Sequence, residues 1–263
     1  MLIYFINVAQ RTDRRAFMEQ QLKRLGLEAI RIEAVTPAEL TDAERARMRA
    51  VRPPDRPMLD GPLCCSLSHE RTLTAMLATG EPWALILEDD VVLSDKLGAF
   101  LAAFEQSPPQ ARAVRIEAAA LATLTLLRPA GEFAGVGLHR FAGYNEGSAG
   151  YLISRDGARM VLAGEHIRAN EMDVAMFYDL SPLSRQLKAL QANPALCIQA
   201  SHIEGNKAPH ARSDLQGPRG NKPAGWRRRM QMAIERDILQ GGRKVWWRVV
   251  RGGQRTRVYL APQ

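Results

Sequence analysis

Three consecutive acidic residues, Glu88, Asp89 and Asp90, directly follow the apolar run 83–87. An uninterrupted apolar run of this length is typical of a central strand covered on both faces. Carboxylates gathered at the end of such a strand repel one another unless a cation joins them, and oxygen ligands suit Mg²⁺ or Mn²⁺. Because alternate side chains of an extended chain point to the same side, we expect Glu88 and Asp90 to address one metal site and Asp89 to face away. The alternative is a solvated acidic turn.

A second group of polar side chains follows the N-terminal apolar run 2–7. Asn7 ends that run, and Arg11 and Arg14 lie at the start of a helical pattern over 12–25. Guanidinium groups match phosphate geometry, and the N–H groups at a helix start favour anions. We therefore expect these three side chains to contact a phosphate or a uridine. The alternative is an ordinary exposed helix start.

Strand-like and helix-like patterns alternate over the first 204 residues. We expect strands at 2–7, 27–32, 83–87, within 113–127 (one or two), at 149–154 and at 194–199, and helices at 12–25, after a Thr36–Glu39 capping box, at 63–79, after a Ser94 cap and at 155–162. The alternation predicts an α/β fold with a mainly parallel sheet flanked by helices. In such sheets ligands bind at the carboxyl ends of the strands, where both polar groups are expected.

The net charge of +8 is unevenly distributed. Between Gly205 and Val258 the chain carries 14 Lys and Arg against 3 Asp and Glu, whereas the rest carries 22 against 25. We therefore divide the chain into a body, 1–204, and a basic linker with an amphipathic C-terminal extension, 205–263. From Trp226 onward apolar residues recur every fourth position among arginines, which is typical of a helix on an anionic membrane surface. The alternatives are a helix packed on the body and a nucleic-acid-binding segment.

Composition excludes several classes of protein. With 46% hydrophobic and 24% charged residues among 263, the chain is expected to fold. No apolar stretch reaches the ~18 residues of a membrane-spanning helix, and the N-terminal run lacks the features of a signal peptide. Cys64, Cys65 and Cys197 match neither a disulfide framework nor a zinc spacing, so we interpret them as buried small side chains in a reducing compartment. A cytoplasmic protein is expected.

Four segments together resemble a known family. They are INVAQRTDRR (6–15), GPLCCSLSH (61–69), WALILEDDV (83–91) and SAGYLISRDGA (148–158). In this order and approximate spacing they are similar to motifs of glycosyltransferase family 25, the lipooligosaccharide galactosyltransferases. Val8, Pro62 and Cys64 depart from the family pattern, which has leucine, glutamate and glycine at these positions. The resemblance covers residues 2–204.

The resemblance implies a GT-A type fold that transfers a sugar, typically galactose from UDP-galactose, to a saccharide hydroxyl with inversion. It also implies a Mn²⁺ or Mg²⁺ cofactor held by Asp90 and Glu88, with Asp89 facing the donor sugar or bracing the loop. In GT-A enzymes the chain after the last strand often supplies a third metal ligand, for which His202 is the candidate. The alternative for His202 is an exposed loop position.

Further site residues follow from the same resemblance. Ser68 and His69 are expected at the UDP-sugar donor, together with Asn7, Arg11, Arg14, Glu88 and Asp89. The alternative for His69 is a hydrogen-bonded residue of the core or of the wall. The candidate catalytic residues are Asp173, as the general base, and Asp89. Glu171 and Asp179 compete with Asp173, which could also be an ordinary acid at a helix start.

We expect the enzyme to act on a saccharide or lipid-linked saccharide at the inner face of the plasma membrane, held there by its basic C-terminal part and binding no nucleic acid. Two other classes remain open. A nucleotidyltransferase shares this kind of α/β fold, but would carry a Gly- and Lys/Arg-rich phosphate loop near its N-terminus. A non-catalytic protein could bind an anionic surface or RNA through the basic tail.

Overall fold

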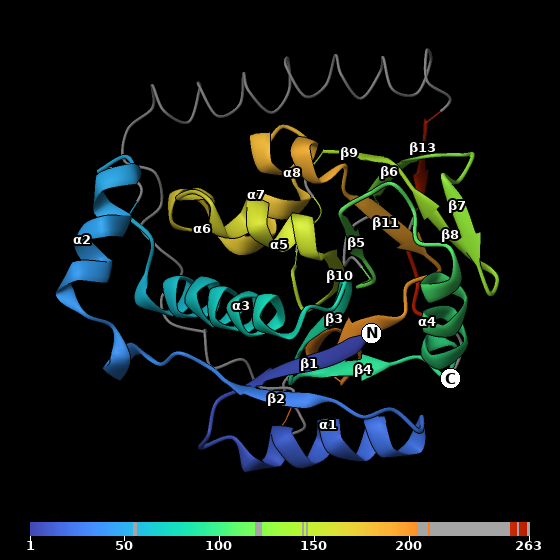
Figure 1. Ribbon diagram of the computed structural model, residues 1–263, viewed down its shortest axis with the longest axis horizontal. Helices are drawn as coiled ribbons and strands as arrows, with labels where there is room; N and C mark the ends of the chain where they lie inside the picture. Colours follow the sequence, from blue (N-terminus) through green and yellow to red (C-terminus); the bar gives the residue numbers. More distant parts are fainter. Residues whose placement is uncertain are drawn as a thin grey trace.

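A central sheet of eight strands, in the order β2-β1-β3-β10-β5-β11-β8-β7, organises the chain (Figure 1). The computed structural model describes residues 1–54, 57–118, 123–143, 145, 147–204, 210, 253–256 and 258–261. The strands of the sheet are β1 (Leu2–Asn7), β2 (Ile30–Glu33), β3 (Trp83–Glu88), β5 (Ala113–Arg115), β7 (Gly131–Phe133), β8 (Val136–His139), β10 (Gly150–Ser154) and β11 (Leu190–Asn193). Six of them run in one direction, and β8 and β10 run in the other. The predicted α/β fold with a mainly parallel sheet is thus confirmed.

Helices cover both faces of this sheet (Figure 1). On one face, α1 (Thr12–Arg24) and α4 (Leu97–Gln106) pack against it with side chains such as Met18 and Phe100. On the other face, the long helix α3 (Asp60–Thr79) packs beside α5 (Arg155–Leu162), α6 (His166–Ala169), α7 (Met172–Phe177) and α8 (Pro182–Leu187). The result is a three-layer arrangement with a hydrophobic core on each side of the sheet.

Strand β3 contributes to both cores. Leu85 and Leu87 belong to the core beneath α1 and α4, whereas Ala84 and Ile86 belong to the core beneath α3, and all four are 0% exposed. Burying one Leu or Ile side chain stabilises a fold by about 1.5–3 kcal/mol. Burial on both faces explains the continuous apolar run of this strand, and it fixes the point at which Glu88 leaves the sheet.

The chain after β3 differs from the sequence prediction. Ser94 was expected to cap a helix, but α4 begins only at Leu97, and its cap position is Lys96. The Ser94 hydroxyl oxygen instead accepts a hydrogen bond from the Lys96 backbone N–H at 3.2 Å, within the turn before the helix. The intervening residues form β4 (Val91–Leu93), which pairs antiparallel with β12 (Cys197–Gln199). This pairing joins segments about a hundred residues apart in the sequence, and local patterns do not predict it.

Other boundaries moved less. The Thr36–Glu39 capping box is confirmed, but it begins a short 3₁₀ helix, η1 (Pro37–Glu39). The charged helix α2 (Asp42–Val51) has its own cap, Thr41, whose hydroxyl oxygen accepts from the Glu44 backbone N–H at 3.1 Å. Strand β2 begins three residues later than predicted, and α3 begins three residues earlier.

The described residues of the C-terminal part pack against the body. Strand β13 (Gly253–Thr256) pairs with β6 (Thr123–Leu126), which also pairs with β9 (Phe141–Ala142). Val258 and Ala261 are each 1% exposed, and Ala261 belongs to the core beneath α4. The amphipathic pattern from Trp226 lies outside the described residues, and the division at residue 204 stays a prediction.

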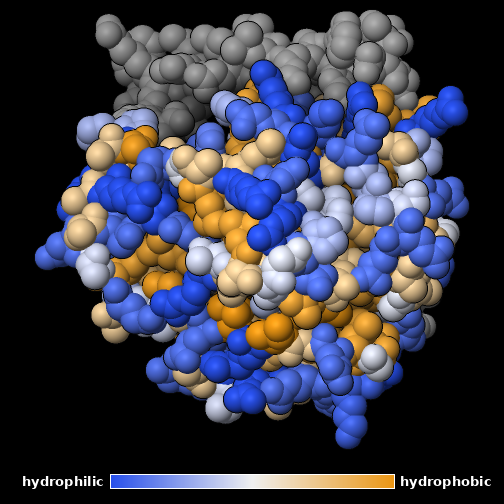
Figure 2. Space-filling model, in the orientation of Figure 1, coloured by the Kyte–Doolittle hydropathy of each residue, from blue (hydrophilic) through white to orange (hydrophobic). Residues whose placement is uncertain are grey.

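Polar side chains cover most of the visible described surface, with apolar atoms in patches between them (Figure 2). Such a mixed surface is ordinary for a globular protein. Among the described residues, no helix is long and apolar enough to cross a membrane.

Candidate active site

A cavity of about 330 Å³ lies where β1 and β3 end, next to the start of α1 and the first half of α3. Seven of the residues expected from the sequence line it: Arg11, Arg14, Ser68, His69, Glu88, Asp89 and Asp90. The parallel strands β1, β2 and β3 all end at this edge, which is the usual ligand-binding edge of an α/β sheet. Side chains from both polar groups found in the sequence therefore share one cavity, whereas Asn7 is 1% exposed and is not among the described lining residues.

Asp89 is held by side chains from β1 and α1. The Asn7 Nδ2 atom donates to Asp89 Oδ2 at 2.7 Å, and Arg14 Nη1 donates to Asp89 Oδ1 at 2.8 Å. Asn7 Nδ2 also donates to the Arg11 carbonyl oxygen at 3.1 Å. Asp89 was expected to face away from the metal site, and this prediction is wrong. Residues 89 and 90 form a turn instead of continuing the strand, and Asp89 lines the cavity. Because both of its oxygens accept hydrogen bonds from this chain, its geometry favours the bracing role over contact with a sugar.

Asp90 combines one engaged oxygen with one unengaged oxygen. Arg14 Nη2 lies 3.2 Å from Asp90 Oδ2, whereas Asp90 Oδ1 is buried and accepts no hydrogen bond from any described residue. A buried carboxylate oxygen without a partner is costly, and such atoms are rare in folded proteins. Together with the carboxylate of Glu88, this oxygen fits the ligand preference of Mn²⁺ or Mg²⁺.

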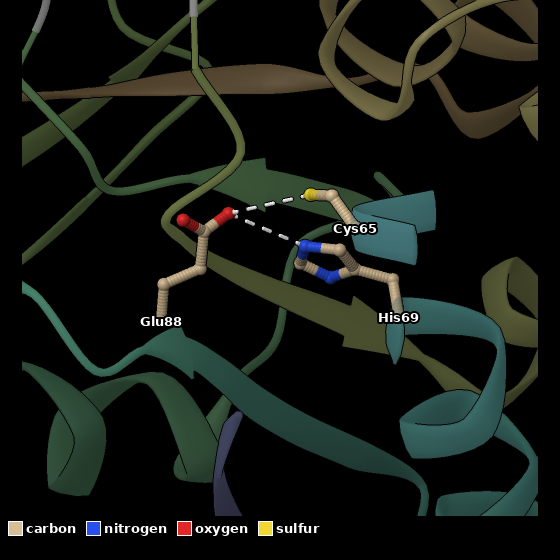
Figure 3. Close-up of side chains that lie close together, drawn as sticks. All are labelled: Cys65, His69 and Glu88. Atoms are coloured by element: carbon tan, nitrogen blue, oxygen red, sulfur yellow. Dashed lines mark hydrogen bonds and ion pairs between the residues drawn. The ribbon is translucent and has the colours of Figure 1, made fainter. Parts of the chain in front are cut away.

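Glu88 faces α3. Its Oε1 atom lies 3.4 Å from His69 Nε2 and 4.0 Å from Cys65 Sγ (Figure 3). On the other side of the imidazole ring, His69 Nδ1 lies 3.0 Å from the Tyr151 hydroxyl oxygen. Tyr151 therefore packs in the sheet, with its hydroxyl group bonded to a residue of the cavity.

Burial dominates the electrostatics of this cavity. It raises the pKa of Glu88, with a further rise from Asp89, and it raises the pKa of Asp90, with a further rise from Glu88. The guanidinium of Arg14 acts in the opposite direction on both acids. Burial also lowers the pKa of His69 to about 4, so its imidazole is neutral at pH 7. A cation bound between the acids would relieve the repulsion that raises their pKa values.

Ser68 and Arg11 line the cavity but also bond within the protein. The Ser68 hydroxyl donates to the Cys64 carbonyl oxygen at 2.7 Å and accepts from the Val35 backbone N–H at 2.8 Å. Arg11 pairs with Asp13 at 3.0 Å on the outer side of the cavity. Ser68 thus ties α3 to the chain after β2, which shapes the wall of the cavity.

Asp173 lies in the first turn of α7. Its Oδ2 atom accepts from the Gly147 backbone N–H at 3.0 Å, and its Oδ1 atom accepts from the Val174 backbone N–H at 2.8 Å. Its negative charge helps to raise the pKa of Glu88, although it is not among the described residues that line the cavity. Its competitor Glu171 pairs with Arg52 at 3.4 Å. Asp173 as the base stays a prediction.

His202 is exposed on the short helix α9 (Ala200–Glu204). It is not among the described lining residues, although Gln199, just before this helix, is. The Ala200 backbone N–H donates to the Asp90 carbonyl oxygen at 2.7 Å, so the start of α9 is anchored to the acidic turn. His202 as a metal ligand stays a prediction.

Two features near the cavity were not predicted from the sequence, namely the buried carboxylate of Glu117 and the position of Cys65 in the cavity wall. Glu117 is 2% exposed, pairs with Arg115 at 3.3 Å, and accepts from the Ala149 backbone N–H at 2.9 Å, which holds the chain before β10 beside Glu88. Burial raises the pKa of Glu117 to about 8. The sequence signal for Glu117 was its position two residues after Arg115 in an apolar segment, which places two opposite charges on the same side of a strand. Cys65 is half-buried in the cavity wall, whereas the other cysteines are buried as expected.

Comparison with known proteins points to one family. The model of glycosyltransferase family 25 (LPS biosynthesis protein) matches residues 1–176. The lacto-N-neotetraose biosynthesis glycosyltransferase LgtB of Neisseria meningitidis serogroup B is 29% identical over 210 residues, which are 76% of this chain and 75% of that protein. A glycosyltransferase 25 family member of Anopheles gambiae is 33% identical over 96 residues, which are 34% of this chain and 16% of that protein. A solved glycosyltransferase involved in glycosylation of the major capsid of PBCV-1 aligns with 79% of this chain and 98% of its own, at 13% identity and a TM-score of 0.42.

The family match spans more than half of the chain and includes the charged residues of the cavity, from Arg11 to Asp90. It favours the glycosyltransferase interpretation over a nucleotidyltransferase or a non-catalytic binding protein. A sugar donor and a saccharide acceptor are thereby implied. This chain belongs to glycosyltransferase family 25 and is a glycosyltransferase.

Proposed function

We propose that the chain transfers a hexose from a UDP-sugar to a hydroxyl group of a saccharide in lipopolysaccharide or another cell-envelope glycan, with inversion and with a Mn²⁺ or Mg²⁺ cofactor. Galactose is the proposed hexose. The carrying observation is the buried Oδ1 atom of Asp90, which accepts no hydrogen bond from the described part of the chain and lies in a cavity that also contains Arg11 and Arg14. Carboxylates that can hold a cation, next to guanidinium groups that can bind phosphate, are the combination that a nucleoside diphosphate requires. The name of the LgtB relatives and the family description support an envelope glycan.

In this proposal each part of the cavity has one task. Glu88 and Asp90 hold the cation, which when bound neutralises charge on the departing diphosphate. Arg14 keeps both acids of the turn in position through its contacts at 2.8 and 3.2 Å. Arg11 and the N–H groups at the start of α1 bind phosphate oxygens of the donor.

Inversion requires a general base on the acceptor side. We assign this role to Asp173, which would take the proton of the acceptor hydroxyl while the hydroxyl oxygen bonds to the anomeric carbon and UDP leaves. The two backbone N–H groups that it accepts from would hold its carboxylate in one orientation. Transfer also requires a site that excludes water, because water would otherwise hydrolyse the donor.

The test is release of UDP by the purified protein with Mn²⁺, a panel of UDP- and CMP-sugars, and saccharide acceptors. We expect release from one UDP-hexose that depends on both the cation and the acceptor. Asp90→Asn should reduce release by about 100-fold or more, because a catalytic cation contributes several kcal/mol. The matched control is Asp42→Asn, the same chemical change at a fully exposed side chain. Wild-type turnover by Asp90→Asn would show that the metal assignment is wrong, and inactivity with every UDP-sugar would reject the donor class.

We also propose that the basic part, 205–263, holds the enzyme at an anionic membrane surface, where each basic residue contributes roughly 1 kcal/mol. Deleting this part would be a poor test, because Val258 and Ala261 are buried against the body. Changing Arg227, Arg228 and Arg229 to Glu removes charge from the sequence region in question and leaves these core residues in place. Wild type should sediment with anionic vesicles but not with neutral ones, and the variant should lose most of this binding. Equal binding by both proteins would contradict the proposal.

A further inference from the structure

Three side chains with different ligand atoms meet in the cavity wall. Cys65, His69 and Glu88 offer a thiol, an imidazole and a carboxylate whose ligand atoms all lie within 4.8 Å of one another (Figure 3). Cys65 and His69 are four residues apart on α3, so they lie one above the other on one face of the helix. All three line the cavity, and a ligand entering it could therefore reach them.

The distances resemble those around a small tetrahedral cation. Zinc with bonds of about 2.0 Å to nitrogen and oxygen and about 2.3 Å to sulfur places those ligand atoms roughly 3.3 Å (N···O) and 3.5 Å (S···O) apart. Here His69 Nε2 lies 3.4 Å and Cys65 Sγ lies 4.0 Å from Glu88 Oε1. The nitrogen and oxygen are already at coordination spacing, and the distance from sulfur to oxygen is about half an ångström longer than coordination requires.

The Tyr151 hydroxyl group orients the His69 imidazole from the side of the ring opposite Glu88. The hydroxyl group of Tyr151, a residue of β10 in the core beneath α3, lies 3.0 Å from His69 Nδ1, and both side chains are 0% exposed. An outer partner on one ring nitrogen directs the other nitrogen toward a metal, and such partners are typical of metal-binding histidines. In this arrangement Nε2 of His69 is directed at Glu88.

We propose that Cys65, His69 and Glu88 form a binding site for a thiophilic divalent cation such as Zn²⁺. This site differs in its ligand atoms from the proposed Mn²⁺ or Mg²⁺ site of Glu88 and Asp90, although the two sites share Glu88. Thiolate and imidazole favour Zn²⁺ and Co²⁺, whereas Mg²⁺ and Mn²⁺ favour oxygen. As the sulfur–metal bond forms, the Cys65 thiol releases its proton to solvent. Because Glu88 cannot serve both sites fully, Zn²⁺ should inhibit the Mn²⁺-dependent reaction; this consequence alone rests on the proposed function.

The test is titration of the full chain with Co²⁺, monitored by the thiolate-to-cobalt charge-transfer absorption. Wild type should develop the band at one equivalent, and Zn²⁺ should abolish it. Cys65→Ser should lose the band, whereas the controls Cys64→Ser and Cys197→Ser should keep it. Tyr151→Phe should keep the band but weaken Co²⁺ binding by about 10- to 100-fold.

A measurement on the unaltered protein guards against misfolding of the variants. X-ray absorption of the Zn²⁺-loaded wild type should show one sulfur ligand at about 2.3 Å. Absence of the band from wild type at saturating Co²⁺, absence of a sulfur ligand, or a band that persists in folded Cys65→Ser would each overturn the proposal. None of these readouts uses a sugar donor, so failure of the UDP-release assay with a positive cobalt titration would reject the proposed function and leave this site standing.

Discussion

Replacing Arg14 by Met removes a positive charge that two buried carboxylates share. Arg14 contacts Asp89 at 2.8 Å and Asp90 at 3.2 Å, and the three side chains are 8%, 7% and 12% exposed. Removing one partner of a buried ion pair costs about 3–5 kcal/mol, because the remaining charge is left uncompensated. Two acids lose the same partner here, so we expect a loss of unfolding free energy of about 5 kcal/mol at pH 8.

The loss should depend on pH, because the two carboxyl groups can take up protons. Burial raises the pKa of Asp89 and Asp90, and Arg14 acts against that rise, so Arg14→Met raises both pKa values in the folded state further. A carboxyl group with a raised folded-state pKa stabilises the protein below its unfolded-state pKa, and this contribution is lost as pH rises through the folded-state pKa. The variant should therefore be closest to wild type near pH 5 and fall further behind as pH approaches 8.

Urea unfolding of metal-free protein at pH 5 and pH 8 measures both effects. The matched control is Arg15→Met, the next position on α1, where Arg15 pairs with Glu19 at 2.7 Å and both side chains are about half exposed, at 50% and 49%. An exposed pair of this kind is worth about 0.3–0.5 kcal/mol. A loss of stability in Arg14→Met no greater than that in Arg15→Met at pH 8, or an equal loss at both pH values, would contradict this role of Arg14.

Three further substitutions test other parts of the structure. Asp90→Asn removes a buried charge that Glu88 repels. The melting temperature of the metal-free protein should therefore rise by about 2–4 °C for each kcal/mol gained, while UDP release is lost. A lower melting temperature would argue against the repulsion inferred at Asp90. Glu117→Gln should flatten the pH dependence of stability, because wild type loses the contribution of Glu117 as pH rises through about 8; parallel stability curves for both proteins would count against this cause. Phe104→Ala should cost about 3–5 kcal/mol in urea unfolding, since Phe104 is 0% exposed between α4 and the sheet, and a cost below about 1 kcal/mol would contradict that packing.

Much of the fold could be predicted because its signals are local. The apolar run of β3, the helical pattern of α1 and the capping box at Thr36 each occupy a few consecutive residues, and each was found at or near the predicted position. The insertion of β10, antiparallel, between β3 and β5 could not be predicted in this way. Strand order depends on which apolar edges meet in the folded chain, and no short window of sequence contains that information.

The candidate site divides along the same line. The acids after β3 and the arginines of α1 were identifiable from residue type and position, because carboxyl ends of strands and helix starts have predictable chemistry. Asp89 braces the turn through Asn7 and Arg14, which lie 82 and 75 residues from it in the chain. Asp90 is left with a buried oxygen that accepts no hydrogen bond from any residue the structure describes. The approach of Cys65 and His69 to Glu88 likewise requires α3 to lie across the end of β3.

The family, the α/β class and the set of charged groups available at one edge of the sheet follow from the sequence, because periodicity and short motifs are properties of neighbouring residues. Which of those groups pair with one another, which lose contact with water and which face the cavity follow only from the folded chain. Pairing and desolvation arise only when distant segments pack together, and they set the pKa values of the same residues.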